Sequence, residues 1–218
     1  MKIYQISGLG ANEKAFKYLK IHPDFELVYL PWIQPEIGES LEHYAERMSE
    51  SIDTNEEFNL MGLSFGGIIA QEMNRFLNPK LNILISTVKS RQELPSIMRF
   101  SSHSHLHKLI PPKFISSDNG ISYAVFRKIY NAKLPDINEF FEFRDPYYLK
   151  WSINQIVNWK NNVEMGNFVH IHGNKDLVFP ISKIKDPLVV EGGTHVMVMQ
   201  KARKVSALVN QELEKIGK

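Results

Sequence analysis

Gly62-Leu63-Ser64-Phe65-Gly66-Gly67 stands between an apolar run at residues 58–63, typical of a buried strand, and a helical pattern over about 65–77. A serine in this place must turn sharply from strand to helix. Glycines two positions to either side let the two elements approach each other. The stretch therefore predicts a strand, a strained turn at Ser64 and a helix, with a glycine-rich turn and a helix-capping serine as the alternative.

The alternation of strands and helices continues outward from this turn in both directions. Strands are expected at residues 2–7, 26–30, 58–63, 81–87, 167–172 and 187–190. Helices are expected over residues 12–20, from a Ser40 cap to about 52, over 65–77 and over 196–216. This order predicts an α/β fold with a mostly parallel sheet of about six strands, helices on both faces and functional groups beyond the carboxyl ends of the strands.

Residues 89–165 interrupt the alternation. They carry helical runs, several prolines and half of the chain's aromatic residues. We interpret this segment as an inserted helical cap over a core formed by residues 1–88 and 166–218. Its aromatic residues are expected to line a pocket over Ser64 or to form the small core of the cap, and they include Phe100, Tyr123, Phe126, Tyr130, Phe140, Phe141, Phe143, Tyr147, Tyr148 and Trp151.

A serine hydroxyl needs a base to accept its proton. His195, in Gly192-Gly193-Thr194-His195, follows the last expected strand and is the favoured base among the eight histidines. Two others, His170 and His172, alternate onto one face of a strand that is expected to be buried. The group at 103, 105 and 107 lacks an accompanying carboxylate or cysteine, so it indicates a solvated or pocket-lining segment rather than a metal site.

The base in turn needs an acid that fixes its orientation. Asp176 follows the strand expected at 167–172, in His172-Gly173-Asn174-Lys175-Asp176, which is also good turn chemistry. Asp186 is the weaker candidate, because it precedes the final strand instead of following one.

Two backbone N–H groups are candidates for stabilising a developing oxyanion. One belongs to Phe65, at the start of the helix behind Ser64, and the other to Leu9, in the glycine-rich loop after the first strand. A nucleotide-binding role for that loop is disfavoured, because Glu13 stands where the third glycine of G-x-G-x-x-G would be.

The composition excludes several classes of protein. The chain has 218 residues, 43% of them hydrophobic, which suffices for the core of one domain. A net charge of +2 without long runs of one sign argues against a nucleic-acid partner, and the absence of cysteine excludes disulfides and thiolate sites. No stretch reaches the length of a membrane span, and a cytoplasmic protein is the expectation.

Four motifs in order resemble the α/β-hydrolase superfamily over nearly the whole chain. They are Ser7 to Ala11, Gly62 to Gly67, His172 to Asp176 and Gly192 to His195. The resemblance implies Ser64 as nucleophile, Asp176 as acid and His195 as base, with the N–H groups of Leu9 and Phe65 as oxyanion hole. One departure is Ser7, which stands where many members have a histidine.

The resemblance implies a serine hydrolase, and the aromatic residues of 89–165 indicate a small, apolar ester as its substrate. No metal or cofactor is expected. The alternatives are the same triad acting on a thioester, an amide or a carbon–carbon bond, and a ligand-binding member of the fold without catalysis. The expected partner is a small-molecule substrate. The oligomeric state stays open.

Overall fold

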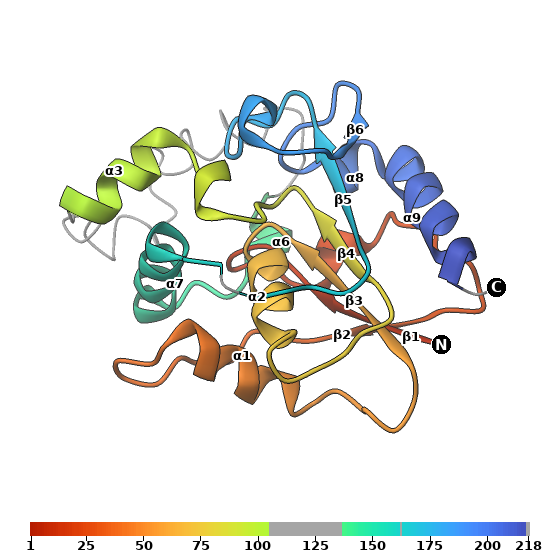
Figure 1. Cartoon of the computed structure of the whole chain (residues 1–218), viewed down its shortest axis with the longest axis horizontal. Helices are drawn as coiled ribbons and strands as arrows, with labels where there is room; N and C mark the ends of the chain where they lie inside the picture. The colour runs from red at the N-terminus through yellow and green to blue at the C-terminus, as the bar shows by residue number, and fades with distance from the viewer. Residues whose placement is uncertain (105–136, 162, 217–218) are drawn as a thin grey trace.

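The fold is organised around a single parallel sheet in the computed structural model, which describes residues 1–104, 137–161 and 163–216 (Figure 1). The strands are β1 (Lys2–Ile6), β2 (Glu26–Tyr29), β3 (Phe58–Leu63), β4 (Asn82–Ile85), β5 (Phe168–Gly173) and β6 (Leu188–Val190). They lie in the order β2-β1-β3-β4-β5-β6, and every neighbouring pair is parallel. The expected shortened parallel sheet is confirmed.

Helices cover both faces of this sheet (Figure 1). The α-helices are α1 (Leu41–Ser49), α2 (Phe65–Met73), α3 (Ser96–Ser104), α6 (Ile137–Phe140), α7 (Pro146–Asn158), α8 (Met197–Gln200) and α9 (Ala202–Ile216). Short 3-10 helices are η1 (Glu13–Phe16), η2 (Arg91–Glu93) and η4 (Ile181–Lys183). One face packs against α1, α2 and α7, and the other against η1, α8 and α9.

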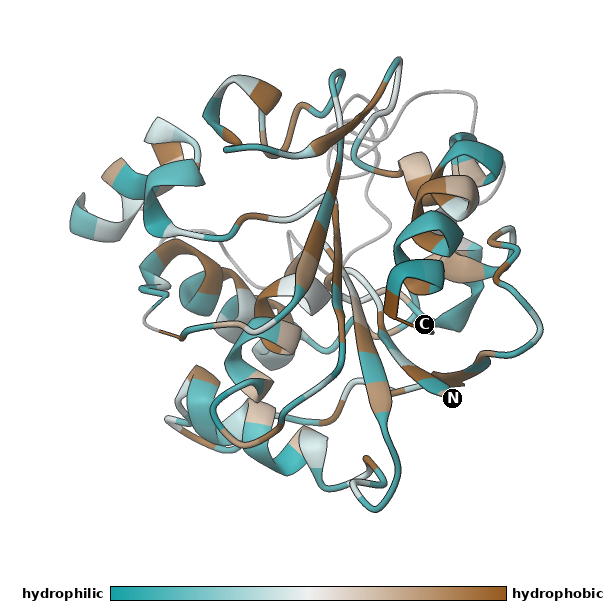
Figure 2. Ribbon diagram, turned by 45° about the vertical axis from the view of Figure 1, so that its right-hand side comes forward, coloured by the Kyte–Doolittle hydropathy of each residue, from teal (hydrophilic) through white to brown (hydrophobic). Residues whose placement is uncertain are grey.

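The central strand β3 shows why the sheet is stable. All six of its residues are buried, and neighbours such as Leu60 and Met61 enter the cores on opposite faces. Burying one such side chain contributes roughly 1.5–3 kcal/mol. Hydrophobic residues accordingly concentrate on the central strands (Figure 2).

Two expected helices differ from the structure. The helix expected over residues 12–20 is only the four-residue η1, which begins at a cap formed by Asn12; the Asn12 N–H and side-chain amide also bond to residues 139–142. The final helix is divided into α8 and α9 at Lys201, whose backbone (φ −122°, ψ 26°) leaves the helical region.

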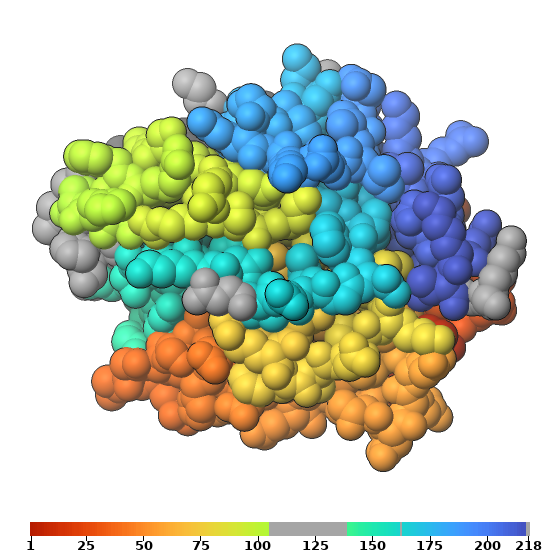
Figure 3. All heavy atoms as spheres, in the orientation of Figure 1, coloured from red at the N-terminus to blue at the C-terminus, as the bar shows by residue number. Residues whose placement is uncertain are grey.

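The segment expected as a cap contains α3, α6 and α7 in its described parts, and α3 packs against α7 (Figure 3). Tyr148, Leu149 and Trp151 of α7 are buried in the same core as α2 and the sheet, whereas Phe100 of α3 is 63% exposed. Most of the cap's central portion, including Tyr123, Phe126 and Tyr130, lies outside the described residues.

Across the described parts of the chain, every helix is too short or too polar to cross a bilayer.

The elbow between β3 and α2 depends on the absence of a side chain at Gly66. A Cβ there would fall on the carbonyl oxygens of Ile6 and Ser7, which are rigid backbone at the end of β1. Gly166 offers a contrast, since nothing lies within 4 Å of a Cβ built on it.

We therefore expect Gly66→Ala to lower the free energy of unfolding by about 3 kcal/mol or more, although alanine is the better helix former. The control Gly166→Ala should stay within about 0.5 kcal/mol of the wild type. Urea unfolding measures both variants, and equal stabilities would contradict this account of the elbow.

Candidate active site

Ser64 occupies the strained turn that the sequence predicts. Its backbone is left-handed (φ 54°, ψ −117°), a conformation that non-glycine residues adopt only when their surroundings impose it. The Ser64 N–H donates to Ile85 O at 2.9 Å, and Thr87 Oγ1 donates to Ser64 O at 2.7 Å. The Ser64 side chain makes no capping hydrogen bond to α2, so the capping alternative is wrong.

The three side chains singled out in the sequence lie in one hydrogen-bonded row. His195 Nε2 is 2.8 Å from Ser64 Oγ, and His195 Nδ1 is 2.8 Å from Asp176 Oδ2. They come from three separate connections, after β3, β5 and β6, which meet because those strands are parallel and end at the same edge. Ser64 is partly exposed, while His195 and Asp176 are 3% and 4% exposed.

Asp176 is held as a carboxylate by several donors. Besides the His195 ring, the backbone N–H groups of Val178 and Phe179 donate to Oδ1 at 2.8 and 2.9 Å. Burial opposes ionisation of the carboxyl, but the nearby His195 and these hydrogen bonds outweigh it and lower the pKa of Asp176. A group that stays ionised while fixing a histidine ring suits the role of an orienting acid.

His170 and His172 are buried as expected, and their rings meet edge to face at 5.5 Å. His172 Nε2 lies 2.8 Å from Phe179 O and 3.4 Å from Asp176 Oδ2, a proximity that the sequence analysis did not anticipate. Burial lowers the pKa of His172, which therefore stays neutral and donates from Nε2.

The loop after β1 lies beside the nucleophile. A Cβ built on Gly8 would be 3.6 Å from Ser64 Cβ, so this loop approaches Ser64 closely. No described residue accepts a hydrogen bond from the N–H of Leu9 or from that of Phe65. Both groups expected to bind an oxyanion are thus unengaged by the described parts of the protein.

Solved structures resemble this architecture, whereas sequence comparisons identify no relative. No protein-family model matches the chain, and no curated protein matches its sequence. Among solved structures, MenH from S. aureus matches with a TM-score of 0.76 at 12% identity, over 100% of this chain and 95% of its own. The chain adopts the α/β-hydrolase fold.

Two further structures with this fold match at similar levels. A putative lipase from Acinetobacter baumannii has a TM-score of 0.72 at 13% identity, covering 99% of this chain and 84% of its own. A thermophilic esterase from Thermogutta terrifontis has a TM-score of 0.69 at 12% identity, covering 99% and 90%. Because one fold supports many chemistries, function is argued from the side chains of the site.

Two aromatic residues contact the loop after β1: sequence reasoning missed Trp32, and it placed Tyr148 in the cap without anticipating this contact. Trp32 follows β2, and Tyr148 lies in α7. Trp32 Nε1 donates to Gly8 O at 3.2 Å, and Tyr148 Oη accepts from Gly10 N at 3.3 Å. The position of Trp32 just beyond a strand's carboxyl end is a signal that could have identified it, whereas nothing in the sequence links Tyr148 to Gly10.

Among the described residues, one group has the spacing of metal ligands: Glu36, Glu39 and His43. Arg47 already occupies both carboxylate oxygens of Glu39, at 2.8 and 2.9 Å, and His43 Nδ1 is 2.8 Å from Oε1. An ion-pair cluster explains this group. His103 is exposed and pairs with Arg99 O, while residues 105 and 107 lie outside the described parts.

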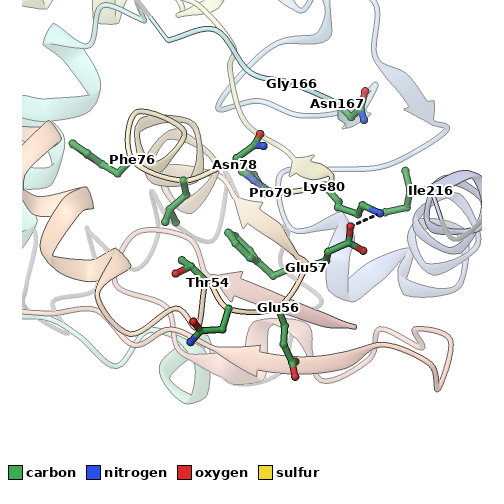
Figure 4. A pocket seen from close by; sticks show the side chains of 13 residues that line it. Thr54, Glu56, Glu57, Phe76, Asn78, Pro79, Lys80, Gly166, Asn167 and Ile216 are labelled. Atoms are coloured by element: carbon green, nitrogen blue, oxygen red, sulfur yellow. Dashed lines mark ion pairs between the residues drawn. The ribbon is translucent and has the colours of Figure 1, made fainter.

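A cavity of about 720 Å³ lies at the opposite edge of the sheet from Ser64 (Figure 4). Its lining comes mainly from the amino-terminal approaches to β3, β4 and β5, at residues 54–58, 76–80 and 166–167. Lys80 and Glu57 form an ion pair across part of it, with Nζ and Oε1 2.8 Å apart. The cavity contains none of the three residues of the hydrogen-bonded row.

The buried histidines make stability depend on pH. Burial, together with His172 and Lys89, lowers the pKa of His170 to about 3. A histidine in the unfolded chain has a pKa near 6.5, so below that pH the unfolded state takes up a proton that the folded state refuses. The free energy of unfolding therefore falls as the pH drops from about 6.5 toward about 3.

We expect His170→Gln to reduce the loss of stability between pH 7 and pH 4.5 by about 2 kcal/mol, because it removes one of the two suppressed protonations. Urea unfolding at the two pH values gives the comparison. Identical pH dependence in wild type and His170→Gln would show that His170 does not resist protonation.

Proposed function

We propose that this protein is a serine hydrolase that cleaves a small, mainly apolar ester through an acyl-enzyme. The observation that carries the proposal is the row Ser64 Oγ to His195 Nε2 and His195 Nδ1 to Asp176 Oδ2, with both distances at 2.8 Å. It places a nucleophile, a base and an orienting acid in mutual contact at the carboxyl edge of the sheet.

In the first step, Ser64 Oγ attacks the carbonyl carbon of the ester while His195 Nε2 takes the hydroxyl proton. The carbonyl oxygen becomes an oxyanion, which accepts hydrogen bonds from the N–H groups of Leu9 and Phe65. The carbonyl then re-forms, and the bond to the alcohol oxygen breaks. His195 returns its proton to that oxygen, so an alcohol leaves and an acyl group stays on Ser64.

In the second step, water attacks the acyl carbon and gives a proton to His195. The second oxyanion collapses, the bond to Ser64 Oγ breaks, and His195 returns the proton to Ser64. The net products are a carboxylic acid and the alcohol. Asp176 stays ionised throughout and stabilises the imidazolium that forms twice in each turnover.

The same row could act on a thioester, an amide or a carbon–carbon bond, or be kept by a ligand-binding protein without turnover. The neighbouring folds named as a lipase and an esterase support the choice of an ester. In this proposal, residues 89–165 form a cap over a core of 1–88 and 166–218, and the cap supplies an apolar pocket. A panel of esters of increasing chain length, with thioester and amide analogues, distinguishes these substrates.

Ser64→Ala should abolish both covalent labelling by a fluorophosphonate probe and hydrolysis of a small activated ester. The circular dichroism spectrum and the melting temperature should stay close to those of the wild type, because Ser64 Oγ holds no helix cap. Labelling of the variant at the wild-type rate would place the nucleophile elsewhere, and an unlabelled wild type would favour the ligand-binding alternative.

Asp176→Asn should lower kcat severely, whereas Asp186→Asn should not. In serine proteases the corresponding change costs about 10⁴-fold in kcat, because asparagine stabilises the wrong tautomer of the histidine. Asp186 is a matched control, since asparagine tolerates its left-handed backbone (φ 49°). Steady-state kinetics on one activated ester measures both, and the reverse ranking would make Asp186 the acid.

A further inference from the structure

The orientation of the Leu9 N–H is fixed by whatever holds the carbonyl of Gly8. The two groups belong to one peptide unit, and the chain contains no cis peptide bond among its described residues. In a trans peptide the C=O and N–H bonds point in opposite directions. A donor that binds Gly8 O therefore directs Leu9 N–H to the other side of the chain.

Gly8 O lies within hydrogen-bonding distance of three donors, of which Ser7 Oγ is the most distant at 3.5 Å. Ala11 N donates to it at 2.9 Å from within the loop, and Trp32 Nε1 donates at 3.2 Å from the connection after β2. The same indole N–H lies 3.1 Å from Ser7 Oγ, which in turn donates to Ala11 O at 2.6 Å. Trp32 thus contacts the start of the turn that carries Leu9 directly, and its far end through Ser7.

Trp32 also contacts the residue that carries the other proposed oxyanion donor. Its ring stacks on that of Phe65, with centroids 5.4 Å apart and planes 13° from parallel. Trp32 is only 7% exposed and Phe65 is fully buried. One rigid side chain therefore connects the loop of the first donor to the start of α2, where the second donor lies.

The next two peptide units are held by Tyr148 of α7 and by the backbone of residues 142–143, which precede α7. The Gly10 N–H donates to Tyr148 Oη at 3.3 Å, and Gly10 O accepts from the N–H groups of Glu142 and Phe143 at 2.9 and 3.0 Å. Gly10 has a positive φ of 67°, which glycine adopts without strain. The three hydrogen bonds hold the loop in this conformation. Tyr148 is fully buried, and its ring lies 5.6 Å from that of Trp32.

We propose that Trp32 and Tyr148 are positioning residues of the oxyanion hole, which hold the backbone from Gly8 to Gly10 so that the Leu9 N–H faces the reacting carbonyl at Ser64. This inference rests on the proposed function. Core packing alone would need only the rings, whereas here the polar atom of each ring binds the backbone of the loop. A donor displaced by about 1 Å can cost roughly 10²-fold in rate, so such positioning matters to the reaction.

The test compares two pairs of variants that lose the same atoms. Trp32→Phe is matched by Trp159→Phe, because Trp159 is 4% exposed and donates its indole N–H to Glu72 Oε1 at 2.7 Å, away from the loop. Tyr148→Phe is matched by Tyr4→Phe, since Tyr4 is 2% exposed and its Oη accepts a hydrogen bond from the Asp53 N–H at 3.0 Å, away from the loop.

We expect Trp32→Phe and Tyr148→Phe to lower kcat by about 10- to 100-fold, with KM changed less than about threefold. The affinity for a trifluoromethyl ketone, which adds to Ser64 and places an oxyanion in the hole, should fall by the same factor as kcat/KM. The two controls should retain kcat and this affinity even where they lower the melting temperature. Unchanged kcat in the first pair, or equal losses in all four variants, would overturn the proposal.

A second measurement separates this inference from the proposed function. Amide hydrogen exchange at Gly10 and Ala11 should be at least about tenfold faster in Trp32→Phe and Tyr148→Phe than in their controls, because the loop loses its restraints. Unchanged exchange overturns the proposal whatever the activity. The exchange could be faster in the variants while the wild-type protein neither hydrolyses esters nor reacts with the fluorophosphonate. That result would contradict the hydrolase function and leave the restraint of the loop in place.

Discussion

The structure depends on a contact that admits no side chain: the start of α2 lies directly against the ends of β1 and β3. At Gly66 a Cβ would coincide with backbone oxygens of β1, and at Gly62 it would lie 2.5 Å from Gly66 O. This approach brings the loop after β1 next to Ser64. It also holds Ser64 in a backbone conformation that costs of order 1–3 kcal/mol, which hydrogen bonds to Ile85 and Thr87 help to maintain.

His195 and Asp176, the other two members of the row, are held in a different way. Both side chains are buried, and hydrogen bonds fix their positions. An uncompensated buried carboxylate would be severely destabilising, but Asp176 accepts hydrogen bonds from two backbone N–H groups and from the His195 ring. The orientation of the Asp176 carboxylate is fixed, because the N–H groups of Val178 and Phe179 bind Oδ1 and the His195 ring binds Oδ2. It also makes this edge of the sheet sensitive to acid, because the histidines beneath it are buried in the neutral form.

The sequence was most informative where local pattern and global fold agree. The strand Phe58–Leu63, the Ser40 cap of α1 and the meeting of Ser64, Asp176 and His195 follow from periodicity, cap chemistry and the rule that parallel strands end at one edge. The short η1 and the break at Lys201 were not predicted, because the apolar spacing of both segments continues past the points where these helices end. Tyr148 was expected in a cap, but its contact with Gly10 joins residues 138 positions apart.

The order of these pieces along the chain has a consequence during synthesis. The groups that hold the elbow end with Ile85 and Thr87, but the histidine that contacts Ser64 comes 131 residues after the serine, and Tyr148 lies 138 residues after the loop it contacts. A ribosome that has exported only the first half of the protein therefore presents a serine with the reactivity of an ordinary alcohol. In the proposed mechanism, Ser64 therefore lacks its base until the carboxyl-terminal strands have docked, and the nascent chain cannot be acylated before then.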